Sequence, residues 1–168
     1  MTRHLMNRRA CVAAYLLAFV LVAAACGAAE ELDEITEERE FVMIAGQLRE
    51  GYESFPSESS AGYAHEGEEI TAPGPTVRVG VGDRVTITFE NEHYVDERAY
   101  PEPHNFVVVA DKDDYFAEPL WESRTLAISP GESDSVTFTP DAPGTYYYIC
   151  SLGNHRARGM WGQFIVEP

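Results

Sequence analysis

Seven short runs of residues typical of β-strands, separated by turn residues, constrain the fold of this chain most. In several runs apolar and polar residues alternate, as in 84–89, so one face of each strand is suited to a core. Turn signals such as Gly82-Asp83 stand between runs, and no segment has a convincing helical period. We expect an all-β fold, a Greek-key β-sandwich or barrel of about seven to eight strands. The runs are 41–46, 76–79, 84–89, 106–109, 135–139, 145–149 and 162–166.

The first 25 residues have the composition of a targeting segment. They contain three arginines, no acidic residue and an apolar run over 10–25. Three alanines at 23–25 precede Cys26. This arrangement resembles a bacterial lipoprotein signal, which is cleaved before a cysteine that is then acylated. Cleavage without acylation and a retained anchor helix are the alternatives. Because the arginines precede the run and the acids follow it, each alternative places the remaining chain outside the cytoplasm, at the periplasm or the outer face of the membrane.

The remainder of the chain is strongly acidic. Residues 26–168 carry 28 acidic and 9 basic side chains, a net charge of −19. This charge argues against nucleic acid and anionic lipids as partners and favours cationic ones. We expect an acidic, solvated tether at 26–40 and one folded domain at 41–168. Within that domain, 50–74 is rich in Ser, Gly and Glu, and we interpret it as partly disordered rather than as a functional flap.

The most informative chemistry lies between the last two strand-like runs. Cys150, His155 and Met160 fall within eleven residues, and Cys150 is the only cysteine after the first 26 residues. A thiolate, an imidazole and a thioether together suit a soft, redox-active metal. A blue-copper site also needs a second histidine, and His104, followed by an apolar strand, qualifies.

These segments resemble the cupredoxins of the plastocyanin and azurin type from about Pro73 to Pro168. The matching features are Pro73-Gly-Pro-Thr-Val77, His104-Asn-Phe106 and Gly144-Thr-Tyr-Tyr-Tyr-Ile-Cys150. Four residues separate Cys150 from His155 and four separate His155 from Met160. This spacing is similar to the ligand loops of auracyanin, rusticyanin and sulfocyanin.

The resemblance implies a ligand set and the roles of its neighbours. It implies that one copper ion, cycling between Cu(I) and Cu(II), is held by His104, Cys150, His155 and Met160. It also implies that Asn105 fastens the first-histidine segment to the cysteine loop, and that His155 presents its edge as the electron port. Asn154 departs from the pattern, since relatives often have proline there, which weakens the expectation of a rigid loop.

The inferred function is that of an extracytoplasmic, monomeric electron carrier and not an enzyme. Its partners would be redox proteins such as cytochromes or a membrane oxidase or reductase. A copper-binding or delivery protein and an accessory domain of a copper oxidoreductase are the alternatives. A copper enzyme of its own would need several extra histidines, and only His65 and His93, which we interpret as exposed loop residues, remain in the domain. A binuclear copper site would need a second cysteine beside Cys150.

Overall fold

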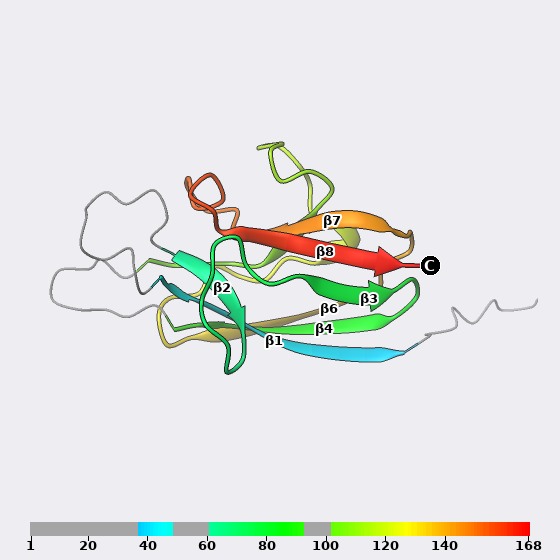
Figure 1. Ribbon diagram of the computed structural model, residues 1–168, viewed down its shortest axis with the longest axis horizontal. Coiled ribbons are helices and arrows are strands. Elements are labelled where there is room, and N and C mark those ends of the chain that lie inside the picture. The colour runs from blue at the N-terminus through cyan, green and yellow to red at the C-terminus, as the bar shows by residue number, and fades with distance from the viewer. Residues whose placement is uncertain (1–36, 49–60, 93–101) are drawn as a thin grey trace, which may run out of the picture. The chain divides into compact units, whose positions relative to one another are not determined.

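Two four-stranded β-sheets form the part of the chain described by this computed structural model, residues 37–48, 61–92 and 102–168 (Figure 1). A short 3-10 turn, η1 (Leu120–Glu122), is the one helical element in these ranges. The predicted all-β sandwich is therefore confirmed. The strands are β1 (Glu38–Gln47), β2 (Ala61–His65), β3 (Val77–Gly80), β4 (Arg84–Asn91), β5 (Val107–Val109), β6 (Ser133–Phe138), β7 (Gly144–Ile149) and β8 (Trp161–Glu167).

The strand order brings distant segments to one end of a sheet. The first sheet has the order β2-β1-β4-β6 and the second the order β3-β8-β7-β5. In the second sheet β5 is antiparallel to β7, with Val107 opposite Ile149. The start of β5 therefore lies beside the end of β7 and the start of β8. His104, Cys150 and Met160 immediately flank these strand ends, so the topology gathers them at the same edge.

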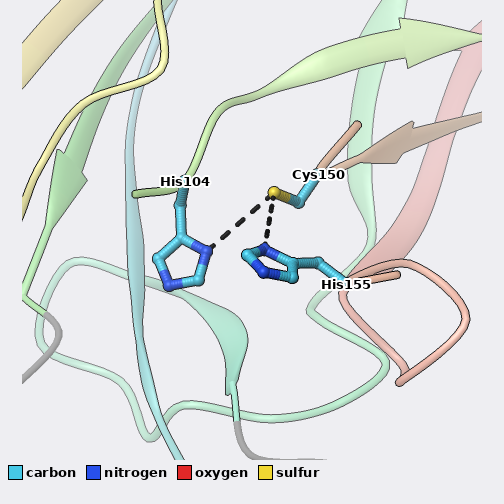
Figure 2. A group of neighbouring side chains, drawn as sticks. All are labelled: His104, Cys150 and His155. Atoms are coloured by element: carbon cyan, nitrogen blue, oxygen red, sulfur yellow. Dashed lines mark hydrogen bonds between the residues drawn. The ribbon is translucent and has the colours of Figure 1, made fainter. Parts of the chain in front are cut away.

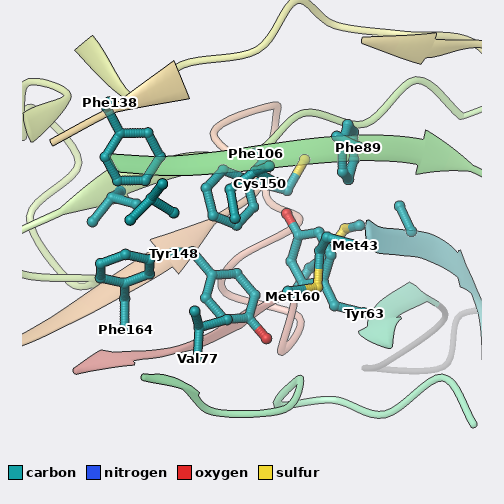
Figure 3. Close-up of a cluster of buried hydrophobic side chains, with 14 of the residues drawn as sticks. Met43, Tyr63, Val77, Phe89, Phe106, Phe138, Tyr148, Cys150, Met160 and Phe164 are labelled. Atoms are coloured by element: carbon teal, nitrogen blue, oxygen red, sulfur yellow. The ribbon is translucent and has the colours of Figure 1, made fainter. Parts of the chain in front are cut away.

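Alternating side chains from both sheets fill the space between them. In β4, Val85, Ile87 and Phe89 are fully buried, while the residues between them are more exposed. Figure 3 shows Phe89 of the first sheet and Phe164 of the second in the same cluster. Each such side chain contributes about 2 kcal/mol when fully buried. The alternation in the sequence is thus the direct cause of the two-layer packing.

The first strand begins earlier than its composition suggests. We predicted a tether through residue 40, but β1 starts at Glu38. Parallel pairing with β4 includes these charged residues, with Glu38 opposite Arg84, and Arg39 Nε lies 3.2 Å from an oxygen of Asp83. Pairing with a neighbouring strand therefore outweighs the low strand propensity of acidic residues. The predicted leader and the tether up to residue 36 lie outside the described residues.

A strand also lies within 50–74, where we predicted a partly disordered stretch. β2 pairs antiparallel with β1, and Tyr63 is completely buried. A Cβ at Gly62 would lie 2.1 Å from the carbonyl oxygen of Thr71, so only glycine allows this close backbone approach. His65 is also a correction, since it ends β2, is half-buried and stacks on Phe41 at 6.1 Å between ring centroids. Residues 49–60 and His93 lie outside the described residues.

Within residues 37–48, 61–92 and 102–168, no helix has the length and apolar character needed to span a bilayer.

Candidate metal centre

Three potential ligand side chains converge at the end of the second sheet (Figure 2). The Sγ atom of Cys150 lies 3.3 Å from Nδ1 of His155 and 3.9 Å from Nδ1 of His104. The ligand atoms of all three residues lie within 4.8 Å of one another. The two imidazole rings are tilted by 57°, with centroids 5.0 Å apart. Both rings therefore present Nδ1 to the space beside the sulfur, as a shared metal ion requires.

His104 is held by the main chain just before β5. It forms an isolated bridge with Ile128, in which each backbone N–H donates to the other's carbonyl, at 3.1 and 2.9 Å. The side chain of His104 is completely buried. A buried histidine fixed in this way has little freedom to leave the cluster, so its ring is positioned before any metal arrives.

The loop from Cys150 to Met160 is closed by its own backbone. The N–H of Cys150 donates to the carbonyl of Met160 at 3.1 Å, and the N–H of Met160 donates to the carbonyl of His155 at 3.0 Å. Gly159 has φ +99°, a conformation that favours glycine, and it returns the chain toward β8. These contacts order the loop although position 154 is asparagine rather than proline. Asn154 also takes part, since its carbonyl accepts from the N–H of Arg158 at 3.1 Å.

Asn105 links the two ligand segments, as predicted. Its Oδ1 accepts a hydrogen bond from the backbone N–H of Ser151 at 2.8 Å, and its Nδ2 donates to Ser151 Oγ at 2.9 Å. The hydroxyl of buried Tyr63 donates to the carbonyl of Asn105 at 2.8 Å. The segment of His104 and the loop of Cys150 are therefore joined through buried or half-buried hydrogen bonds, which hold their shape more firmly than exposed ones.

Met160, the fourth predicted ligand, packs in the core next to the cluster. Its side chain is completely buried, in the same core cluster as Cys150 (Figure 3). Its backbone contacts both Cys150 and His155 through the bonds described above. The structure thus brings the ligand atoms of His104, Cys150 and His155 together and places Met160 in the core beside Cys150.

The outer side of His155 is less open than we expected of an electron port. Its side chain is only 14% exposed, and its Nε2 lies 3.9 Å from Oε2 of Glu102. Arg158 approaches the other oxygen of Glu102, also at 3.9 Å. The sequence did not single out Glu102, because its contact with His155 forms only in the folded chain.

Arg156 is also engaged with its surroundings. Its guanidinium lies over the ring of Tyr115, 3.7 Å from the centroid, and donates to the carbonyl of Asp114 at 2.9 Å. This arginine therefore braces the ligand loop against the segment that follows β5.

The protonation of Cys150 depends mainly on its burial. Burial raises the pKa of the thiol to about 11, backbone N–H groups of Asn105 and Leu152 oppose the rise, and the charge of Glu102 adds to it. The thiol therefore keeps its proton at neutral pH until a metal ion replaces it. Because metal binding must release this proton, metal affinity rises with pH up to about the thiol pKa.

Residues 64–167 match the family described as "Copper binding proteins, plastocyanin/azurin family". The match covers most of the chain, so this chain belongs to that family. The cofactor of the family is copper, and the His104, Cys150 and His155 group with Met160 nearby fits a type-1 copper site.

The chain is also similar to individual proteins and to solved structures. It is 33% identical to L-ascorbate oxidase of Cucurbita pepo var. melopepo over 96 residues, which span 57% of this chain and 17% of that protein. It is 50% identical to auracyanin-B of Chloroflexus aurantiacus over 44 residues, 26% of this chain and 19% of that one. The crystal structure of reduced auracyanin from Roseiflexus castenholzii superposes with a TM-score of 0.52 and 23% identity over 80% of this chain and 99% of that chain. The last similarity concerns the fold alone.

Proposed function

We propose that this protein is an electron carrier that holds one type-1 copper ion. The observation that carries the proposal is the convergence of Cys150, His104 and His155, with ligand atoms within 4.8 Å, in a member of a copper-binding family. When bound, copper supplies a one-electron couple, Cu(I)/Cu(II). The protein supplies a rigid set of donors that suits both oxidation states.

Each of the four residues has a separate role in this proposal. Nδ1 of His104, Nδ1 of His155 and Sγ of Cys150 would hold the ion, and Met160 would be the weak axial ligand. The buried bridge of His104 and the closed loop limit rearrangement between oxidation states. Since His104, Cys150 and Met160 are completely buried, only His155 offers an edge toward a redox partner.

The alternatives concern copper chemistry beyond electron transfer. The similarity to L-ascorbate oxidase keeps open the role of an accessory domain in a copper oxidoreductase. Within the described residues, however, the group of His104, Cys150 and His155 is the one cluster suited to a metal ion. A copper-delivery protein would require exchangeable binding, whereas these ligands are buried and held by hydrogen bonds. We therefore favour a carrier without catalytic activity of its own.

Copper loading followed by electron exchange tests the proposal. The loaded protein should show an intense visible thiolate-to-copper band and exchange electrons rapidly with a basic cytochrome. Because residues 26–168 carry a net charge of −19, the second-order rate should fall as salt is added. Absence of the visible band would contradict the type-1 assignment. A rate that rises with salt would show that positive groups near the site govern docking and that the partner is acidic.

Met160 should adjust the reduction potential more than it holds the metal. A weak axial bond contributes modestly to affinity but affects the balance between the two oxidation states. Replacing Met160 with leucine should keep the blue colour and raise the potential, whereas glutamine should lower it. Redox titration of both variants measures this, and an unchanged potential in both would show that Met160 only packs the core.

We also propose that the protein acts outside the cytoplasm, attached by a lipid on Cys26. The arginines before the apolar run and the cysteine after it support this location. Cys26→Ala should release the protein into the soluble fraction or block its processing, because each buried acyl methylene contributes about 0.8 kcal/mol to membrane binding. Membrane retention with an intact leader would favour the anchor helix instead.

A further inference from the structure

Glu102 lies against the one site ligand that is not completely buried. Its Oε2 atom is buried, has no hydrogen-bond partner, and lies 3.9 Å from Nε2 of His155. That distance is too long for a direct hydrogen bond but short enough for an ion pair. A buried carboxylate oxygen without a donor is costly, so its position calls for an explanation.

A hydrogen bond to its carbonyl anchors the main chain of Glu102 and so fixes where the side chain approaches His155. The buried side chain of Asn91, at the end of β4, donates from Nδ2 to the carbonyl of Glu102 at 3.0 Å. The same Nδ2 donates to the carbonyl of Ile128 at 2.9 Å, and Ile128 is the bridge partner of His104. One asparagine therefore fixes Glu102 and the first-histidine segment relative to each other.

The two ring nitrogens of His155 have different surroundings. Nδ1 faces the sulfur of Cys150 at 3.3 Å, while Nε2 faces Glu102. If Nδ1 binds a metal, the neutral ring must carry its proton on Nε2. Histidine ligands commonly donate this outer N–H to a carboxylate, which fixes the ring and makes it a better donor.

We propose that Glu102 is a positioning residue that accepts the outer N–H of His155 and lowers the reduction potential of the site. This inference rests on the proposed function. With Nδ1 bound to a metal ion, the N–H on Nε2 of His155 would be a stronger donor toward Oε2, and it would supply the donor that this oxygen lacks. The negative charge stabilises Cu(II) more than Cu(I), so it favours the oxidised protein. Glu102 also partly covers the edge that a redox partner would contact.

Arg158 balances the charge of Glu102 on its other side. It lies 3.9 Å from Oε1, and its side chain is 27% exposed. An arginine on one oxygen leaves the other available to His155. It also reduces the cost of keeping a carboxylate near the buried ligands.

Two variants of Glu102 separate its charge from its hydrogen bond. Glu102→Gln keeps an acceptor oxygen but loses the charge, and Glu102→Ala loses both. Both should raise the reduction potential, shifting the equilibrium with a fixed redox mediator severalfold toward the reduced protein. By NMR of the Cu(I) protein, the Nε2–H signal of His155 should persist in wild type and Glu102→Gln. In Glu102→Ala it should be lost to solvent exchange.

Glu167→Gln is the matched control. Glu167 ends β8, the strand that begins after Met160, and it also pairs with an arginine, Arg78, at 3.3 Å. This variant loses the same charge and the same kind of ion pair at the opposite end of the strand. It should leave the reduction potential and the Nε2–H signal of His155 unchanged. Arg158→Gln should retain the Nε2–H signal.

Two results would overturn the inference. One is that both Glu102 variants keep the wild-type Nε2–H signal of His155 and shift the reduction potential no more than Glu167→Gln does. The other is loss of the signal in Arg158→Gln, which would mean that Glu102 acts only through the arginine. A wild-type protein without the blue band would defeat the proposed function instead, while the His155 signal of the Cu(I)-loaded protein still decides the role of Glu102.

Discussion

Replacing Cys150 with serine should abolish the visible colour of the copper-loaded protein while the domain remains folded. The thiolate is the charge-transfer donor, and a serine hydroxyl cannot replace it at visible energies. Cys150 is completely buried, but serine has a similar size and keeps the backbone bond to Met160. Its hydroxyl can also bond to the imidazoles of His104 and His155. Visible absorption and circular dichroism of the loaded variant measure the two halves of this prediction.

Cys26→Ser is the control for loss of a thiol elsewhere, and it should keep the full colour. Cys150 is the one free cysteine in the part of the chain that the structure describes. If the Cys150→Ser protein stays intensely coloured, another sulfur is the ligand and the proposed site is wrong. If it loses both colour and fold, Cys150→Ala shows whether the polar hydroxyl in a buried place is the cause.

The sandwich could be predicted because its strands are encoded locally. The alternation in β4 and the turn before it specify both a strand and its buried face. All seven predicted runs form strands, with ends that differ by a few residues. Strand ends depend on the neighbouring strand, and the charged start of β1 is set by its pairing with β4.

β2 escaped prediction because its strand character comes from long-range contacts. Its sequence, Ala-Gly-Tyr-Ala-His, has one strong strand former. The strand exists because Gly62 permits close approach to Thr71, and because Tyr63 fits into the core beside Tyr148, 5.1 Å between ring centroids. Neither partner is visible from local composition.

The residues of the site also fall into two groups, those that the sequence predicts and those whose contacts depend on the folded chain. Cys150, His155 and Met160 could be predicted because one loop carries them, and His104 because it precedes an apolar strand. Glu102 could not be assigned a role, since its contact with His155 joins residues 53 apart and depends on the pairing of β5 with β7. Spacing therefore identifies ligands, whereas the groups that adjust them become evident only in the folded chain.

Replacing Gly162 with alanine should destabilise the protein by roughly 2–3 kcal/mol, the upper part of the usual range for overpacking a core. Gly162 lies opposite Tyr148 in the pairing of β7 and β8. A Cβ there would lie 2.2 Å from both Cζ and the hydroxyl oxygen of Tyr148. The tyrosine ring cannot easily move, because its hydroxyl donates to the carbonyl of Pro75 at 2.6 Å and its face stacks on Phe106 at 5.3 Å. Denaturant unfolding of the metal-free protein measures the loss.

Gly46→Ala is the matched control, since it makes the same change within β1. A Cβ at Gly46 would lie 3.1 Å from the terminal carbon of Ile70, a flexible group that can shift. Its cost should be small, because alanine also restricts the unfolded chain. In a Tyr148→Leu background, which lacks the outer ring atoms, Gly162→Ala should cost much less than in wild type. Equal costs in the two backgrounds would show that the added methyl group does not act through Tyr148, and that the narrow space beside the ring does not require glycine.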